Sequence, residues 1–321
     1  MMEINYHVFI ELSKIFNDKP FDVTPAFADF QISKGIELKF YVDSLQQPMI
    51  LCWAEVKKIK IIGLVLNIHG PTYSEDVSIK QLQKFYKNIT CLEYNAFFIN
   101  STLEYSVLFE EAIRKAGFKR PIGQSSTNLT IVVDTFNFDP DRNWRRNLKK
   151  ASKTMYTVES KKELSLDECL IIENLHKENA ESKKLSYTLK ANQIYKLCKA
   201  SNIKVFFLKL ENEFMAARII SVEENISYDI FACNSFKSKL DGATHFLMQY
   251  IFDYLKNQNI QYFDFSRIPL GRKGAYGVYE FKKSTRGKLL QYNSEWVFFK
   301  NKKLRHLYYL YNLIINKKDF Y

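Results

Sequence analysis

The sequence predicts an α/β (α+β) protein of two tandem domains, each a mixed sheet with helices on both faces. Short apolar or alternating segments of strand length recur along the chain, separated by segments with helical spacing. The order is weakly repeated, because residues 38–56 and 204–222 both predict a pair of strands. Residues 106–118 and 245–262 both predict a helix that ends before a strand. The length of 321 residues suits about two domains.

The first half of the chain predicts strands that alternate with helices. Leu108, Ala112 and Ile113 follow helical spacing, and Gly117 is typical of a residue that ends a helix. His69-Gly70-Pro71 predicts a turn after a strand. The expected strands are residues 37–44, 48–56, 58–68, 91–100 and 128–134, and the expected helices are residues 78–87 and 107–116.

The second half begins with a helix-start pattern, Asp139-Pro140-Asp141, in which an acidic residue caps the helix and proline precedes its first turn. The domain boundary is expected there, so the sequence predicts domains over residues 1–134 and 135–300 and a terminal segment over 301–321. The expected helices are residues 142–153, 166–180, 191–200, 241–256 and 303–315, and the expected strands are residues 204–210, 214–222, 226–233, 261–265, 278–282 and 289–299.

Composition narrows the class of protein. Hydrophobic residues make up 46% of the chain and charged residues 26%, which is ordinary for a globular protein and excludes disorder as the main state. The five cysteines form no CxxC pair and the five histidines are scattered, so we expect neither a disulfide framework nor a metal site. No apolar stretch has membrane-spanning length and the N-terminus does not resemble a secretory signal, so we expect a cytoplasmic protein.

The chain is basic, with a formal net charge of +12 from 47 Lys and Arg against 35 Asp and Glu. This balance favours an anionic partner such as a nucleotide ligand, RNA or a membrane surface. Solvated surface lysines that reflect a general compositional bias would give the same balance. Both interpretations stay open at this point, including a non-catalytic RNA-binding protein, a class also favoured by the 15% of aromatic residues.

Several segments, taken in order, resemble the FemABX family. They are Gly70-Pro71 after a strand, Glu110–Phe118, Arg142–Ala151 after a strand that ends in Asp134, Asp241–His245, Tyr262–Arg267 and Gly274–Lys283. The similarity in order extends over about residues 20 to 300. It implies two tandem domains of the GNAT acyltransferase fold, in which backbone N–H groups of a splayed strand hold the oxyanion while an amine attacks the carbonyl directly.

The resemblance also implies an activity. It predicts an N-acyltransferase that moves an acyl group from an activated carrier, acyl-CoA or a similar thioester, to an amine of a cell-envelope glycan or peptidoglycan precursor. The acceptor would be an anionic small molecule or a lipid-linked precursor bound between the domains. The alternative is an aminoacyl-tRNA-dependent peptidyltransferase, with tRNA as partner. Either carrier acts as a co-substrate, so no permanently bound cofactor and no DNA partner are expected.

The donor site is expected where a strand leads through a polar loop into the helix at residue 241. Backbone N–H groups at a helix N-terminus bind anions, and glycine permits close approach of a pyrophosphate. Only Gly242-Ala243 matches the usual GNAT phosphate-loop pattern, so the support for a phosphate loop is weak. A simple strand-to-helix connection is the alternative. The expected donor-binding residues are Gly242, Ala243, Ser235 and Ser238.

Cationic side chains form a second candidate set. The helix from Arg142 has one apolar face formed by Trp144, Leu148, Ala151 and Met155, and its other faces are densely basic. Guanidinium groups match phosphate oxygens, although a solvated helix face gives the same pattern. The expected phosphate-binding residues are Arg142, Arg145, Arg146, Lys149, Arg267, Lys283 and Arg286.

Three residues are candidates for the chemistry itself. By its resemblance to the Phe-Lys of the family's acceptor site, Lys282 is expected to hold a developing oxyanion or a phosphate. Asp264, at a strand end, is a candidate general base, and Tyr276 is a candidate proton donor to the leaving group. A strand-edge lysine, a capping aspartate and a packing tyrosine are the structural alternatives.

The C-terminal segment predicts a basic amphipathic helix. Leu304, Leu307, Tyr308, Leu310, Tyr311 and Ile314 recur at helical spacing, and Lys302, Lys303, Arg305, Lys317 and Lys318 bracket them. Such a helix can lie in a membrane interface, so weak peripheral membrane contact is expected. Docking of the same helix against the protein core is the alternative.

Overall fold

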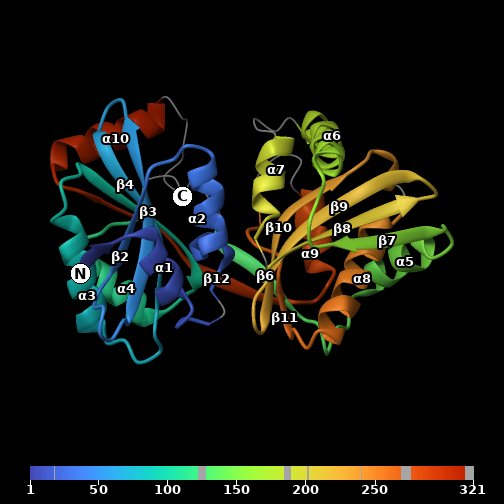
Figure 1. Cartoon of the computed structure of the whole chain (residues 1–321), viewed down its shortest axis with the longest axis horizontal. Helices are drawn as coiled ribbons and strands as arrows, with labels where there is room; N and C mark the ends of the chain where they lie inside the picture. The colour runs from blue at the N-terminus through green and yellow to red at the C-terminus, as the bar shows by residue number, and fades with distance from the viewer. Residues whose placement is uncertain are drawn as a thin grey trace. The chain divides into compact units, whose positions relative to one another are not determined.

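The computed structural model describes residues 1–17, 19–121, 128–183, 189–200, 202–239, 241–268 and 276–314. It divides into two compact units, residues 1–128 with 290–321, and residues 129–289 (Figure 1). These units differ from the expected domains at both ends. The strand β12 (Lys288–Phe299) pairs with β5 (Ala96–Glu104), so this strand and the helix that follows it return to the first unit.

The first unit contains a mixed sheet with strand order β1-β2-β3-β4-β5-β12. Most neighbours are antiparallel, whereas β4 and β5 are parallel. The remaining strands are β1 (Met2–Ile4), β2 (Leu38–Val42), β3 (Ile50–Ile59) and β4 (Gly63–Tyr73). The chain reverses between β3 and β4 at residues 60–62, later than the expected break at Lys57-Lys58, and the expected turn at residues 69–71 lies inside β4.

Helices cover both faces of this sheet. The helices α3 (Ile79–Thr90) and α4 (Val107–Lys115) share one core with strands β3 to β5. The opposite face packs against α1 (Tyr6–Ser13), α2 (Pro25–Ser33) and α10 (Lys302–Ile314). A short 3-10 helix, η1 (Phe21–Val23), precedes α2. The sequence did not predict β1, α1 or α2, whereas the positions of α3 and α4 agree with the expected helices.

The second unit contains a sheet with strand order β6-β11-β10-β9-β8-β7. Its strands are β6 (Leu129–Asp134), β7 (Tyr156–Lys161), β8 (Ile203–Leu210), β9 (Glu213–Val222), β10 (Ile226–Asn234) and β11 (Tyr262–Asp264). β10 and β11 are parallel and pair only from Ile226 to Tyr228. β10 continues beside β9 alone, with a register shift between Asp229 and Phe231, so β10 and β11 part at Asp229.

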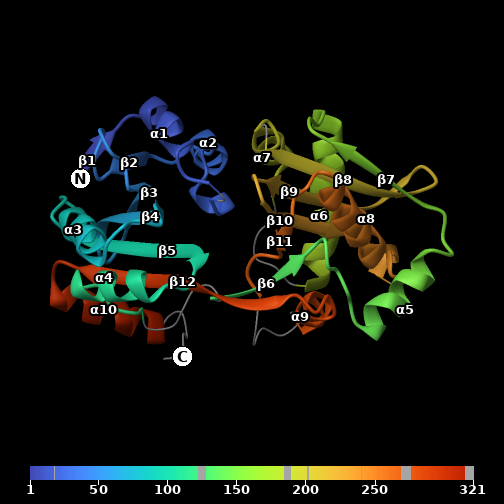
Figure 2. The ribbon, with the colours of Figure 1, turned by 90° about the horizontal axis from the view of Figure 1, so that it is seen from below.

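Helices again cover both faces of the sheet, as Figures 1 and 2 show for this unit. The helix α8 (Ala243–Asn257) packs on one face with α5 (Arg142–Ala151) beside it, and α6 (Leu166–Lys183) packs on β9 and β10, next to α7 (Ala191–Leu197). The mixed α/β class with helices on both faces of each sheet is therefore confirmed.

Two expectations in this unit are wrong, and one strand was missed. Residues 278–282 were expected as a strand but lie in the helix α9 (Tyr276–Lys283). The strand β7 was not predicted. Met155, expected on the apolar face of α5, is 86% exposed because α5 ends at Ala151 and Met155 lies in the connection to β7.

A buried carboxylate in the first unit makes its stability dependent on pH. Glu55 on β3 is buried beside His69, whose Nε2 lies 3.3 Å from Oε1, and beside the ammonium of Lys57. Burial alone would raise the pKa of Glu55, but the contacts with His69 and Lys57 outweigh burial and lower it to about 2. A depressed carboxyl pKa stabilises the fold above the ordinary pKa, and this stabilisation is lost as the pH falls towards the folded-state value.

We expect Glu55→Gln to lower the free energy of unfolding by about 1–3 kcal/mol at neutral pH. The difference from the native chain should shrink as the pH falls from about 4.5 towards 2. Urea unfolding between pH 2 and 7 measures it. The exposed Glu75 provides the control, since Glu75→Gln changes the same charge without burial. An equal loss in both variants would contradict the assignment.

Candidate active site in the second unit

A buried lysine marks the point where β10 and β11 part. Lys282 on α9 donates from Nζ to three successive backbone carbonyls, those of Phe265 at 2.6 Å, Ser266 at 3.3 Å and Arg267 at 3.0 Å. An ammonium group has three N–H donors, so these contacts engage all of them. The ammonium therefore holds the backbone that follows β11 rather than pointing a free N–H at a substrate.

The lysine lies among charged groups that the sequence had only partly identified. Arg218 on β9 and Asp229 on β10 form a buried ion pair, with Nε 2.9 Å from Oδ1 and a second contact between Nη2 and Oδ2. Burial lowers the pKa of Lys282 to about 8, while Asp229 and Asp264 favour its charged form and Arg218 opposes it. Arg218 was not predicted, although a single arginine within the apolar run Phe214–Val222 was a signal for a buried pair.

Asp264 is buried at the end of β11, and its bonds explain its position. Its carboxylate accepts from the Ser266 N–H at 2.6 Å and from the Thr130 hydroxyl. Ser266 has a φ of +57°, and its hydroxyl donates to the Asp229 carbonyl at 2.6 Å. These bonds stabilise the turn after β11, so the structure favours a positioning role for Asp264, and its role as a general base stays a prediction.

Tyr276 does not join this cluster. It is the first residue of α9 and its side chain is 72% exposed, whereas Lys282 is buried. At 3.6 residues per turn the six-residue separation places the two side chains on different faces of the helix. Residues 269–275, which include the start of the segment Gly274–Lys283, lie outside the described residues.

The loop before α8 is arranged differently from an open phosphate loop. Gly242 caps α8 with a φ of +73°, and a side chain on it would meet the Asn147 carbonyl oxygen at 2.3 Å. The close approach that requires glycine is thus made by the backbone of α5. The Ser238 hydroxyl donates to the Ser235 carbonyl at 2.8 Å, the Ser235 hydroxyl accepts from the Ser238 N–H at 3.2 Å, and both side chains are buried, as is Ala243.

The cations of α5 are exposed and lie beside this loop. Arg142, Arg145, Arg146 and Lys149 all face solvent, and Lys150 approaches Asp241 at 3.4 Å. Asp139 joins Arg145 to Arg286, whose Nη1 is 3.2 Å from the Asp139 carboxylate. The fold therefore brings the α5 cations, Arg286 and the start of α8 together. Lys283 is exposed on α9, and the backbone carbonyl of Arg267 is one of the three that Lys282 bonds.

The fold of this chain is also found in solved structures, among them a tandem GNAT protein. No family model matches the sequence, and no curated protein matches it. Solved structures share its fold over nearly the whole chain. FemX is 15% identical with a TM-score of 0.75, covering 98% of this chain and 100% of FemX. L-PGS from Bacillus licheniformis is 14% identical with a TM-score of 0.65, covering 98% and 97%.

A third structure of the same fold is the tandem GNAT protein from the clavulanic acid biosynthesis pathway, solved without AcCoA. It is 7% identical with a TM-score of 0.55, and the match covers 92% of this chain and 94% of that one. The resemblance to FemABX proteins seen in the sequence is therefore confirmed at the level of the fold.

Gly242 allows a direct test of the packing of α5 on α8. We expect Gly242→Ala to destabilise the protein, because alanine is strained at positive φ and its Cβ meets the Asn147 carbonyl. Gly35 has a φ of +81° with nothing within 4 Å, so Gly35→Ala measures the conformational effect alone. Thermal unfolding should show Gly242→Ala losing at least about 2 kcal/mol more. Equal losses, with weaker donor binding in Gly242→Ala alone, would restore the phosphate role.

Proposed function

We propose that the second unit transfers an acyl group from an activated carrier to an amine of a cell-envelope glycan or peptidoglycan precursor. The observation on which this rests is the parting of β10 from β11 at Asp229, with the Lys282 ammonium buried at that point. The tandem fold shared with FemX, L-PGS and a tandem GNAT protein supports it.

The chemistry needs little beyond this geometry. With a thioester donor, the amine nitrogen attacks the carbonyl carbon, the C–N bond forms, the C–S bond breaks, and the amine proton ends on the departing thiolate. Beyond Asp229, β10 no longer pairs with β11. Its backbone N–H groups on that side would bind the oxyanion. Lys282 acts as a positioning residue, because its N–H groups hold the carbonyls after β11 while its charge favours the anion.

An acyl thioester such as acyl-CoA is the first candidate donor. The α5 cations and Arg286 would bind its phosphates. The loop at Ser235 and Ser238 is closed by its own hydrogen bonds and would stabilise the start of α8. Aminoacyl-tRNA is the second candidate, favoured by the exposed cationic face of α5, since an open basic helix suits an extended polyanion. The tandem GNAT protein, solved without AcCoA, shares the fold with FemX and L-PGS, so the fold leaves both donors open.

Lys282→Met tests the proposal. The native chain should transfer an acyl group to an amine acceptor when offered acyl thioesters and charged tRNAs in turn, with products identified by mass spectrometry. We expect Lys282→Met to lower turnover by about tenfold to a hundredfold, with a smaller effect on donor affinity. Native turnover should fall as the pH rises through about 8, because the lysine then loses the proton that completes its three bonds.

Lys288→Met is the matched control, since Lys288 is an exposed lysine a few residues after α9. It should keep both the turnover and the pH profile. If Lys282→Met unfolds, Lys282→Arg replaces it in the test, because arginine retains the positive charge. No transfer with either class of donor would contradict the proposed function, and an unchanged pH profile in a folded Lys282→Met would contradict the role of the lysine.

A lipid-linked acceptor would suit the surface of α10. Leu304 and Tyr308 pack on the first unit, whereas Leu307, Leu310 and Ile314 are 51%, 52% and 68% exposed. One face of α10 is therefore docked on the protein core, and another face is exposed and available for membrane contact. Lys317 and Lys318 lie outside the described residues, and none of the described helices is both long and apolar enough to cross a bilayer.

We expect the full chain to bind anionic liposomes weakly and to dissociate at high salt, because Lys302 and Lys303 flank the exposed apolar residues. The double variant Leu307→Ser, Leu310→Ser should lose most of this binding in co-sedimentation. Val107→Ser, at a residue 70% exposed on α4, is the control and should bind as the native chain does. Equal binding by all three proteins, or none, would contradict membrane contact through α10.

A further inference from the structure

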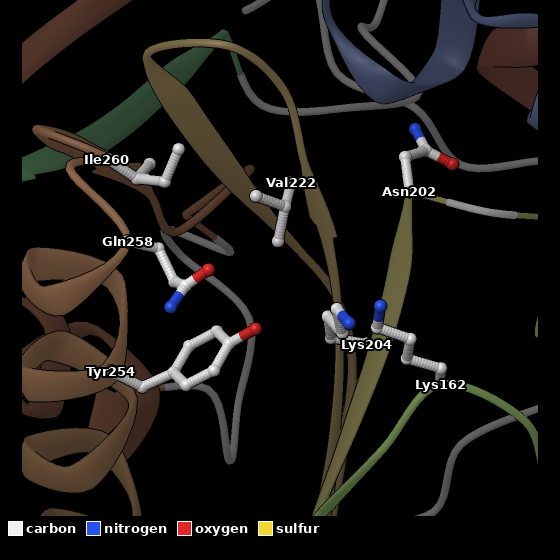
Figure 3. A pocket seen from close by; sticks show the side chains of 7 residues that line it. All are labelled: Lys162, Asn202, Lys204, Val222, Tyr254, Gln258 and Ile260. Atoms are coloured by element: carbon white, nitrogen blue, oxygen red, sulfur yellow. The ribbon is translucent and has the colours of Figure 1, made fainter.

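A pocket of about 340 Å³ lies at the other end of the second unit's sheet from Lys282 (Figure 3). It is formed where β8 and β11 begin, where β7 and β9 end and where α8 ends, whereas the candidate active site lies beyond the first residues of β10. Its volume is at the lower end of the range of small-molecule sites. The lining residues are Lys162, Asn202, Lys204, Val222, Tyr254, Gln258 and Ile260.

The charge in this pocket is of one sign. Lys162 and Lys204 are the only ionic residues among the seven that line the pocket, so neither has an acidic partner in its lining. Lys204 lies within hydrogen-bonding reach of Lys162, and its pKa is lowered by partial burial first and by Lys162 second. Two lysines in contact repel each other, and an anion between them would remove that repulsion.

The remaining lining groups suit the rest of a small ligand. The Tyr254 hydroxyl and the Gln258 amide face the lysines across the pocket in Figure 3, and Val222 and Ile260 supply an apolar wall. The Asn202 amide nitrogen donates to Glu223 at 2.8 Å, which leaves its oxygen as an acceptor for a ligand hydroxyl. This combination of two cations, neutral amides and a short apolar wall matches a phosphate group on a small hydroxylated body.

The C-terminal end of α8 offers a different explanation for the lysines, since a helix C-terminus attracts cations. Three of the last four carbonyls of α8 are already bonded, because the Gln258 N–H donates to those of Tyr254 and Leu255 at 3.1 and 3.0 Å and the Asn259 N–H donates to that of Lys256 at 3.1 Å. If the lysines served this helix end, removal of one would destabilise the protein. If they await an anion, its removal relieves repulsion, so the two explanations predict changes of opposite sign.

We propose that this pocket is a binding site for a small phosphate monoester, with the phosphate held between Lys162 and Lys204. The site is independent of the transfer reaction, because its residues lie at the opposite end of the sheet. It gives this protein a second ligand besides its donor and acceptor.

The test uses the full chain and measures binding by calorimetry and thermal unfolding at constant ionic strength. Glycerol 3-phosphate should bind and raise the melting temperature, inorganic phosphate should bind more weakly, and acetate should not bind measurably. Lys204→Met should weaken the binding of glycerol 3-phosphate at least about tenfold. Without ligand, this variant should be at least as stable as the native chain. Lys162→Met provides a second variant with the same expected result.

Lys84→Met is the control, because Lys84 is an exposed lysine of the first unit, and it should bind glycerol 3-phosphate as the native chain does. Equal affinity of Lys204→Met and the native chain would overturn the proposal, as would binding of acetate as tight as that of the phosphates. A loss of stability in ligand-free Lys204→Met would assign the lysines to the end of α8 instead. No outcome depends on transferase activity, so failure here leaves the proposed function standing.

Discussion

The arrangement of the second unit depends on one buried ammonium group. Lys282 bonds three consecutive carbonyls after β11, and this clamp sets where the chain leaves the sheet and where β10 becomes unpaired on that side. Burial of a charge costs several kcal/mol unless neighbouring groups compensate for it. Here Asp229 and Asp264 balance Lys282 and Arg218, so the cluster is neutral as a set. The lowered pKa of Lys282 shows that burial still outweighs this compensation.

The neutrality of this cluster explains why its members occupy separate elements. Arg218 lies on β9, Asp229 on β10, Asp264 on β11 and Lys282 on α9. Removal of any one leaves an uncompensated charge in the core, so the four residues constrain three neighbouring strands and a helix together. The splayed strands of the candidate site are thus maintained by electrostatics as well as by backbone pairing.

The sequence predicted the regular elements better than the site. Apolar segments of strand length identified β8, β9 and β10, and helical spacing identified α4, because these elements bury most of their apolar side chains. The helix expected over residues 241–256 contains α8. Residues 276–283 combine β-favouring aromatic residues with glycine, so local propensity did not reveal that α9 is a helix whose one buried polar residue, Lys282, bonds a turn distant in sequence. The function of Gly242 was also hidden, since the residue that approaches it, Asn147, belongs to another helix.

The charges at the two ends of this sheet differ in a way that separates structural from ligand-binding groups. At the end where β10 and β11 part, each buried charge has a partner of opposite sign within the fold, so the charges there balance without a ligand. At the other end, Lys162 and Lys204 face each other, and the other residues that line the pocket are neutral. The residues that line that pocket include no acidic side chain, and a bound anion would supply the counter-charge. Charge balance therefore distinguishes a preorganised site from one that a ligand completes.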